Sequence, residues 1–247
     1  MSRTFESIVI FGDGACSGNP GKGGWGVVIA RPNGHVTELG GHAPETTNNR
    51  MEMLAVIKAM EAIQEEKGPV AIHTDSVYVI RGITQWIYGW RSRGWKNAAG
   101  EDVANQDLWE WMFKVVYARK GNDAVKWHYV RGHRGIPGNE RVDEIAVAFT
   151  ASRSGPDLYD GPLNQYAVAI YDIPEDTSLP EMKDRTTKVA AYSYLSLVDG
   201  TLRRHKTWPE CERLVKGRSG ARFKKTTSAA EEEEIAAGWG KSISDCQ

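Results

Sequence analysis

Strand-type and helix-type segments alternate in a defined order through the first 150 residues, and this order restricts the fold more than any other feature. Two apolar runs, SIVIFGDG and WGVVIARPNG, flank a glycine-rich segment, and the turn sequence PNG leads into a third run, HVTELGG. Short apolar runs between such turns predict an antiparallel meander of three strands. A helix to about residue 67, the strand VAIHTD, short helices broken at glycines, a further helix, the strand AVKWHYV and a last helix follow. This order predicts a mixed α/β fold with a five-stranded sheet and flanking helices.

The composition changes after about residue 152, where four prolines punctuate an acidic and polar stretch. We expect a linker there, although QYAVAIYDIP could add a strand. Beyond it, two strand-like runs, a helix around WPECERLVKG, the run ARFKK and the acidic helix SAAEEEEIAAGW predict a small α/β unit. The expected divisions are a domain over 1–152, a linker over 153–187 and a second domain over 188–240.

Composition excludes several protein classes. The chain has 247 residues, of which 40% are hydrophobic and 26% charged, which is typical of a globular protein with a substantial core. No apolar run approaches the roughly 18 residues of a membrane span, and the N-terminus lacks the apolar region of a signal peptide. Three scattered cysteines without a CxxC pair argue against a disulfide or zinc framework. We therefore expect a cytoplasmic protein without a membrane partner, and a monomer because heptads are absent.

One carboxylate occupies a position where an apolar side chain is expected. Ala55, Val56 and Ala59 recur at the i, i+3/i+4 spacing of a buried helix face, and Glu52 opens the same stripe. An unpaired buried charge is unfavourable, so Glu52 must reach a counter-charge, lie at an open edge or belong to a site. The alternative is a first-turn Glu that is favoured by the helix dipole.

Three aspartates interrupt or end other apolar segments. Asp13 breaks the first strand, Asp75 ends the strand VAIHTD, and Asp143 lies within the last helix of the first domain. Strand ends commonly carry sites, because loops open there on a rigid scaffold. Acids that converge there repel one another and need divalent cations, and oxygen ligands suit Mg²⁺ or Mn²⁺. Taken singly, Asp75 could instead cap a helix, and Asp143 could be a surface residue.

Six blocks, in order and correctly spaced, resemble type 1 ribonuclease H from about residue 7 to 151. They are DGACSGNPGKGGWG, TTNNRMEM, TDSVYV, GITQWIYGWRSRGWK, NQDLW and GHRGIPGNERVDEIA. The resemblance implies a ribonuclease H-like fold and endonucleolytic hydrolysis of the RNA strand of RNA–DNA hybrids, leaving 5′-phosphate and 3′-hydroxyl ends. It implies a two-metal mechanism with Mg²⁺, which Mn²⁺ can replace, and no small-molecule cofactor. The metal ligands it implies are Asp13, Glu52, Asp75 and Asp143, and His133 is implied as a mobile catalytic histidine.

The same resemblance implies where the first domain holds the hybrid. Short side chains near glycines would meet the minor groove, Thr47 and Asn105 would form a pocket for a DNA phosphate, and interleaved tryptophans and cations would contact the DNA strand. At least one of these tryptophans belongs to the core in the alternative interpretation. The implied contact residues are Cys16, Asn19, Thr47, Asn48, Asn49, Trp86, Trp90 and Asn105.

Three positions depart from the family pattern. Glu45 stands where many relatives carry an Arg in the phosphate pocket, which would weaken anion binding there. Val77 replaces a polar minor-groove contact of some members, and Ala98 replaces a hydroxyl side chain near the DNA channel. These departures concern the strength of hybrid binding and leave the chemistry unchanged.

The second unit has its own resemblance. YLSLVDGTLRRHKTWPEC and SGARFKK resemble the caulimovirus viroplasmin-like hybrid-binding domain, which many eukaryotic type 1 enzymes carry at the N-terminus. Here the segment follows the catalytic domain instead. A solvated basic face is the alternative interpretation. The contact residues that the resemblance implies are Tyr194, Trp208, Phe223, Lys224 and Lys225.

Two rival functions stay open at this point. One is a non-catalytic RNA–DNA hybrid-binding protein, and the other is a different nuclease of the ribonuclease H-like superfamily. A pure binding protein would not need four such carboxylates. The NNRME block and the tryptophan-rich segment favour a free-standing hybrid nuclease.

Overall fold

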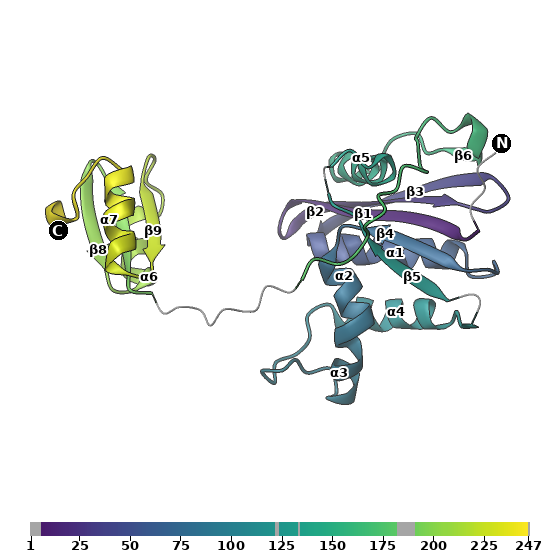
Figure 1. Cartoon of the computed structure of the whole chain (residues 1–247), viewed down its shortest axis with the longest axis horizontal. Helices are drawn as coiled ribbons and strands as arrows, with labels where there is room; N and C mark the ends of the chain where they lie inside the picture. Colours follow the sequence, from purple (N-terminus) through teal and green to yellow (C-terminus); the bar gives the residue numbers. More distant parts are fainter. Residues whose placement is uncertain (1–5, 122–123, 133, 182–190, 247) are drawn as a thin grey trace. The chain divides into compact units, whose positions relative to one another are not determined.

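The chain forms two compact units, Met1–Pro180 and Glu181–Gln247, each with its own sheet (Figure 1). This computed structural model describes residues 6–121, 124–132, 134–181 and 191–246. Within those residues, no helix combines the length and apolar character that a membrane crossing requires. The two units are described separately below.

A mixed six-stranded sheet with the order β5-β4-β1-β2-β3-β6 organises the first unit. The first three strands form the predicted antiparallel meander, and β1, β4 and β5 are mutually parallel. The predicted fold class is confirmed, and the sixth strand is an addition that the sequence did not predict. The strands are β1 (Ile8–Gly18), β2 (Gly21–Ala30), β3 (His35–Thr46), β4 (Val70–Thr74), β5 (Val125–Tyr129) and β6 (Asp160–Pro162).

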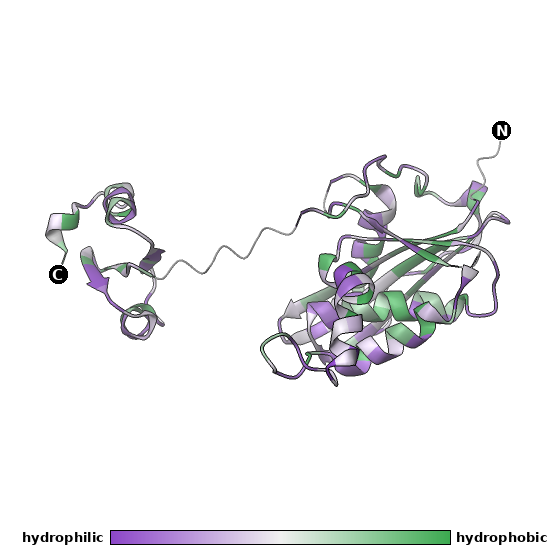
Figure 2. Cartoon of the chain, turned by 60° about the horizontal axis from the view of Figure 1, so that its bottom comes forward, coloured by the Kyte–Doolittle hydropathy of each residue, from purple (hydrophilic) through white to green (hydrophobic). Residues whose placement is uncertain are grey.

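Helices cover both faces of this sheet. On one face, α1 (Asn48–Ala62) packs against the strands and α4 (Gln106–Tyr117) packs against α1, while α5 (Pro137–Ala151) lies on the other face (Figure 1). Successive residues of β1 alternate between the two hydrophobic cores, because side chains of a strand alternate between its faces. Hydrophobic residues accordingly run along the strands and the helices packed on them (Figure 2).

The helices after β4 are not broken at glycine, contrary to the sequence interpretation. α2 (Val77–Arg81) continues through a π-helical turn (Gly82–Trp86) into α3 (Ile87–Ser92). A Cβ atom on Gly82 would lie 1.9 Å from the indole of Trp109. This glycine therefore permits close packing of α4 and does not end a helix.

Residues 153–180, which we call the strap, belong to the first unit and correct the expectation of a linker from residue 153. β6 pairs with β3 at one edge of the sheet. Ile170 is buried in the core beneath α5, and the Thr177 carbonyl accepts a hydrogen bond of 2.9 Å from the Tyr129 amide at the opposite edge strand. The sequence QYAVAIYDIP, considered as a possible strand, forms none; the short strand lies before it.

A buried carboxylate fastens the strap. The Glu38 side chain is fully buried and accepts two bonds from Arg141, of 2.7 and 2.8 Å, and one of 2.6 Å from the Tyr166 hydroxyl. The Tyr159 amide donates a further bond. Burial alone would raise the pKa of Glu38, but these donors outweigh burial and lower that pKa. The strap is thus held by both apolar and ionic contacts.

The second unit is a three-stranded antiparallel sheet with the order β8-β7-β9 and two helices, as predicted. Buried Glu232 accepts hydrogen bonds from Arg204 and Ser193, which ties the second helix of the unit to the sheet. Its elements are β7 (Ser193–Val198), β8 (Thr201–His205), α6 (Trp208–Val215), β9 (Arg222–Thr226), α7 (Ala229–Gly238) and a 3-10 helix (Ile243–Asp245).

The strap generates a stability prediction. A chain ending at Ser152 loses the burial of Ile170, worth about 1.5–3 kcal/mol for one such side chain, and two donors to Glu38. Since 1 kcal/mol shifts the melting temperature by about 2–4 °C at this size, we expect that chain to melt at least about 5 °C below one ending at Pro180. Calorimetry or circular dichroism measures the difference. Equal melting temperatures would show that the strap is not part of the core.

Candidate active site

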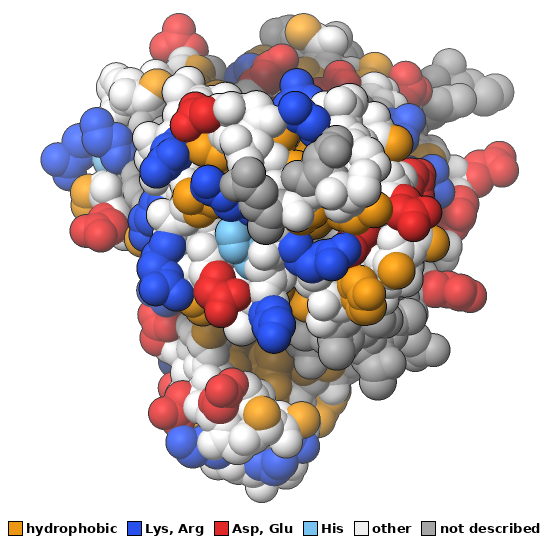
Figure 3. Space-filling view, turned by 90° about the vertical axis from the view of Figure 1, so that its left-hand side faces the viewer, with side chains coloured by type: hydrophobic (Ala, Val, Ile, Leu, Met, Phe, Trp, Pro, Cys, Tyr) orange, Lys and Arg blue, Asp and Glu red, His pale blue; other side chains and the backbone are white. Residues whose placement is uncertain are grey.

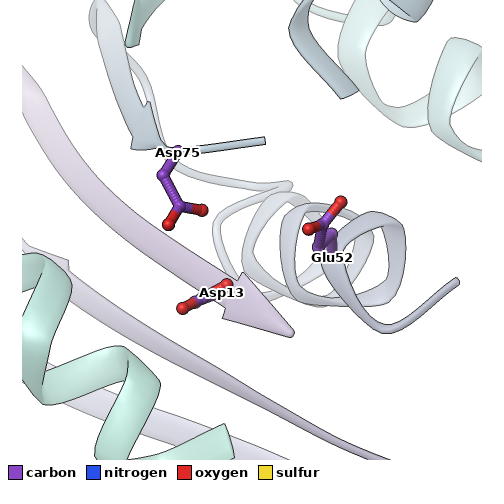
Figure 4. A group of neighbouring side chains, drawn as sticks. All are labelled: Asp13, Glu52 and Asp75. Atoms are coloured by element: carbon purple, nitrogen blue, oxygen red, sulfur yellow. The ribbon is translucent and has the colours of Figure 1, made fainter. Parts of the chain in front are cut away.

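Asp13, Glu52 and Asp75 bring their carboxylates together beside β1, where the neighbouring strand β4 ends (Figure 4). One oxygen from each residue lies within 4.8 Å of the others. Asp13 lies in the middle of β1 and Asp75 directly follows β4. In the parallel register Phe11 pairs with His73, so Asp13 lies level with Asp75 where β4 ends. Glu52 reaches the same place from the first turns of α1.

Two glycines make room for this cluster. A Cβ atom on Gly14 would lie 2.2 Å from the Glu52 amide nitrogen, so only glycine lets α1 approach β1 this closely. A Cβ atom on Gly132 would lie 2.3 Å from Oδ2 of Asp75. The backbone around the carboxylates is therefore as closely packed as the core.

Hydrogen bonds orient Glu52. The Asn48 side-chain amide donates to Oε1 of Glu52 at 2.8 Å, and the Ser76 hydroxyl donates to Oε2. Ser76 also accepts a hydrogen bond from the Val79 amide and so caps α2. Sequence analysis missed this role of Ser76, although a hydroxyl directly after a strand-end aspartate is a recognisable signal.

The cluster changes the acidity of its members. Burial, with the charge of Asp75 as the next cause, raises the pKa of Asp13 from 3.8 to about 8, against a hydrogen bond from the Gly14 amide. Burial and Asp75 also raise the pKa of Glu52, although Ser76 and Asn48 act in the opposite direction. Without a cation, Asp13 therefore carries a proton at neutral pH.

The two remaining predicted site residues stand apart from this group. Asp143 is half-buried on α5, and its charge contributes to the raised pKa of Asp13, but it is outside the three-residue group. His133 lies outside the described residues. The structure therefore brings together three of the four predicted carboxylates and places the fourth nearby.

The donor set fits a divalent cation. Carboxylate oxygens are the ligands that Mg²⁺ and Mn²⁺ prefer, and a cation would offset both the burial and the neighbouring negative charges that raise the pKa of Asp13. A carboxylate cluster at the edge of a sheet is the kind of site at which enzymes hold such ions for displacement at phosphorus. Asp13, Glu52 and Asp75 could hold the ion directly.

The predicted minor-groove residues converge where the β1–β2 turn meets α1. The Asn19 side-chain oxygen accepts a hydrogen bond of 3.2 Å from the Asn48 amide. The thiol of Cys16 donates to the Thr46 carbonyl at 3.4 Å. Thr47 is the N-cap residue of α1, and the Asn49 side chain is exposed beside it. These predicted residues thus adjoin one another and the Glu52 end of α1.

Asn105, the predicted partner of Thr47, lies beside a cation that sequence analysis missed. The Asn105 side chain donates to the Tyr78 hydroxyl at 3.2 Å and accepts from Arg50 at 3.4 Å. Arg50 also forms a salt bridge of 2.7 Å with Asp107. A guanidinium is therefore present at this position, even though Glu45 replaces the Arg of many relatives. The sequence signal for this cation was the position of Arg50 within the NNRME block, directly before Met51.

The predicted DNA-contacting tryptophans Trp86 and Trp90 belong to a cluster of aromatic rings with Trp109 and Tyr78. The ring centroids of Trp86 and Trp90 lie 5.8 Å apart, and those of Trp90 and Trp109 lie 5.4 Å apart. Trp90 and Trp95 are partly buried and pack against the core, as the alternative interpretation expects for at least one tryptophan. Trp86 is half-buried, and its ring also lies 6.2 Å from that of Tyr78, which in turn contacts Trp109.

In the second unit, three of the predicted contact residues form a continuous aromatic row. Trp208 lies between Tyr194 and Phe223, at centroid distances of 5.9 and 5.3 Å. Trp208 is 37% exposed and Phe223 is 51% exposed, so both rings offer stacking surface. Lys and Arg side chains are also numerous among the side chains that face the viewer in Figure 3.

The structure separates the two lysines that the resemblance groups together. Lys225 pairs with Tyr194 in the sheet register and shares the face of the aromatic row. Lys224 pairs with Leu195 on the opposite face, where it lines a cavity with Glu231 and Glu234 of α7. Only Lys225 is therefore placed beside the rings.

Comparison with known proteins assigns the family. Residues 5–150 match the family model described as "RNase H", and the chain belongs to the ribonuclease H family. It is 54% identical over 154 residues to the ribonuclease H of a Cyanothece species, covering 62% of this chain and 94% of that protein. It is 55% identical over 139 residues to the ribonuclease H of Thermosynechococcus vestitus, covering 56% and 84% respectively. The protein is therefore an enzyme, a hydrolase of the ribonuclease H type.

A solved structure shares the fold. The crystal structure described as "LC9-RNase H1, a type 1 RNase H with the type 2 active-site motif" superposes with a TM-score of 0.54 and 32% sequence identity. The match covers 66% of this chain and 82% of that chain. The sheet with its flanking helices is thus the ribonuclease H fold.

The raised pKa of Asp13 makes stability depend on pH in a defined direction. In the unfolded protein the Asp13 carboxyl ionises near pH 3.8, whereas in the metal-free folded protein it keeps its proton up to about pH 8. The folded state therefore loses stability relative to the unfolded state as the pH rises from about 4 to about 8. Asp13→Asn removes this penalty. We expect the variant's unfolding midpoint in urea, with a chelator present, to exceed that of the wild type increasingly between pH 4 and 8. Adding Mn²⁺ should stabilise the wild type more than the variant. A difference independent of pH would contradict the interpretation.

Proposed function

We propose that this protein hydrolyses the RNA strand of RNA–DNA hybrids endonucleolytically, with divalent metal ions, and leaves 5′-phosphate and 3′-hydroxyl ends. The observation that supports this most is the carboxylate group of Asp13, Glu52 and Asp75 in a chain of the ribonuclease H family. A site that only bound nucleic acid would gain nothing from three acids that repel one another and the phosphates.

We assign the metal-holding role to Asp13, Glu52, Asp75 and Asp143, with two Mg²⁺ ions that Mn²⁺ can replace. Such ions, when bound, stabilise the attacking and leaving oxygens of a displacement at phosphorus. Hydrogen bonds from Asn48 and Ser76 fix the orientation of both Glu52 carboxylate oxygens. Gly14 and Gly132 keep the space around the acids narrow. Asp143 would join from α5 when an ion draws the carboxylates together.

His133 is assigned a supporting role in this proposal. An imidazole titrates near neutral pH and can move a proton or assist product departure beside the scissile phosphate. The support for this role is the glycine-flanked sequence RGHRG, together with the close approach of Gly132 to Asp75.

We propose that the hybrid contacts lie on either side of the acids. The convergence of Asn19, Asn48 and Asn49 offers amides for the minor groove, and Asn105 with Thr47 and Arg50 offers a site for a phosphate. Trp86, half-buried in the cluster of aromatic rings, offers a surface for the DNA strand. Arg50 compensates here for the missing Arg at position 45.

The second unit acts, in this proposal, as a hybrid-binding module. Its support is the exposed aromatic row with Lys225 beside it. Because the strap belongs to the first unit, the tether between Pro180 and Ser193 is short, with a fully extended reach of about 40 Å. Binding by one unit would therefore hold the hybrid at high effective concentration for the other.

We further propose that the protein acts in the cytoplasm as a monomer. Cys16 and Cys211 are free thiols in the structure, and the three cysteines are scattered along the chain, which suits a reducing compartment. Exposed large hydrophobic side chains are scattered over both units, as is usual for monomers.

The catalytic assignment generates a direct prediction. Asp75→Asn removes a metal-holding charge without changing the side-chain shape, so we expect hybrid cleavage to be lost while hybrid affinity and melting temperature change little. The matched control is Asp157→Asn, which changes an exposed aspartate of the strap and should cut normally. Cleavage of a labelled hybrid in a gel assay reports both. Normal turnover by folded Asp75→Asn protein would refute the assignment.

The placement of the lysines generates a second prediction. Base or sugar stacking is worth about 1–3 kcal/mol per aromatic, so Trp208→Ala should weaken hybrid binding by about 5–150-fold. Lys225→Ala should reduce the slope of log affinity against log salt by about one unit, as for one lost phosphate contact. Lys224→Ala is the matched control and should change the slope less, because Lys224 faces α7. Fluorescence anisotropy across a salt series measures all three, and equal effects of the two lysines would contradict the assignment.

A further inference from the structure

Three stacked rings cross the first sheet next to the carboxylate cluster. Phe11 on β1, His73 on β4 and His128 on β5 occupy paired positions of the parallel register. The centroids of Phe11 and His73 lie 4.8 Å apart with an interplanar angle of 21°, and those of His73 and His128 lie 4.7 Å apart at 14°. We call these three side chains the ring row.

The ring row lies next to the acids along β1 and β4. Phe11 precedes Asp13 by two residues, and His73 precedes Asp75 by two residues, which is the spacing that returns a side chain to the same face of a strand. The row thus forms the layer of side chains adjacent to the carboxylates.

Both ends of the row are held by other parts of the fold. At the inner end, Gly138 of α5 packs directly on Phe11, because a Cβ atom there would lie 2.7 Å from the ring. At the outer end, Nδ1 of His128 makes a 2.9 Å hydrogen bond with the hydroxyl of Thr177 in the strap. The Thr177 carbonyl also accepts the hydrogen bond that the Tyr129 amide donates at the end of β5.

Core packing alone does not account for the middle ring. His73 is 3% exposed, and its buried Nδ1 has no well-aligned hydrogen bond within the described residues, although the backbone of Ile10 and Ala71 lies near the ring and acts on its pKa. Burying a polar atom without a partner lowers stability, and an apolar side chain would avoid that loss. A flat ring stacked on both sides does, however, fix the spacing of three neighbouring strands.

We propose that the ring row, clamped at its outer end by Thr177, positions Asp13 and Asp75 for metal binding. His128 and Thr177 are thus positioning residues that act through strand geometry and do not touch substrate. The inference rests on the proposed metal-holding role of the acids. It also gives the strap a part in the reaction, because the strap supplies the hydroxyl that fixes the His128 ring.

The test measures metal binding and catalysis separately from stability in the full-length protein. Mn²⁺ affinity is measured by calorimetry without nucleic acid, hybrid cleavage as kcat and KM, and stability as the melting temperature. His128→Ala removes a ring from the stack and should weaken Mn²⁺ affinity and lower kcat by about 10-fold, the lower end of the effect of groups behind metal ligands. KM should stay nearly unchanged. His128→Phe retains the stack and should recover most of the loss.

The hydroxyl clamp is tested by a matched series in the strap. Thr177→Val keeps the shape but removes the hydroxyl, and should lower Mn²⁺ affinity and kcat in the same direction as His128→Ala. Thr177→Ser restores the hydroxyl and should rescue both. Ser178→Ala, the control, removes a neighbouring hydroxyl that bonds only to exposed Asp176 among the described residues, and should have no effect.

Two further variants separate the possible failures. Val36→Ala opens a buried site in the same core on β3, and should lower the melting temperature without changing Mn²⁺ affinity. If His128→Ala behaves like Val36→Ala, the ring row is core packing only and the inference is wrong. If Asp13→Asn leaves Mn²⁺ affinity unchanged, the metal site itself is misassigned, and the proposed function fails first.

Discussion

The repulsion among Asp13, Glu52 and Asp75 is the constraint on which the rest of the first unit depends. Three carboxylates with oxygens within 4.8 Å of one another stay together only because rigid elements leave them no alternative. The parallel register of β1 and β4 brings Asp13 level with Asp75 where β4 ends, and Gly14 lets α1 approach β1 closely. Burial, followed by the charge of Asp75, raises the pKa of Asp13, and a divalent cation turns this unfavourable arrangement into a binding site.

The strap links this site to the organisation of the whole chain. It pairs with β3 at one edge, covers part of the core beneath α5, and reaches β5 at the other edge through Thr177. It thereby determines where the first unit ends and how short the tether to the second unit is. A segment expected as a passive connection is instead part of the scaffold that carries the acids.

Most of the first unit could be predicted because its signals are local. Apolar runs, turns and helical periodicity predicted the strand and helix order, and the strand-end acids predicted the cluster. The strap escaped prediction because β6 has only three residues and its contacts, such as those of Glu38 with Tyr166, join positions 128 residues apart. The roles of Ser76 and Arg50 depend on tertiary neighbours, and the separation of Lys224 from Lys225 depends on strand register, so these features also escaped prediction. His133 is predicted only by resemblance.

The central claim is that this carboxylate edge, with a divalent cation, cuts RNA only when it is paired with DNA. The most direct measurement incubates the full chain with labelled RNA–DNA hybrid, double-stranded RNA, double-stranded DNA and single strands, each with Mg²⁺ and with a chelator. The account predicts cleavage of the RNA strand of the hybrid alone, and only with Mg²⁺, to products with 5′-phosphate ends. Cleavage of double-stranded RNA or DNA at a similar rate, or hybrid cleavage in the chelator, would contradict it.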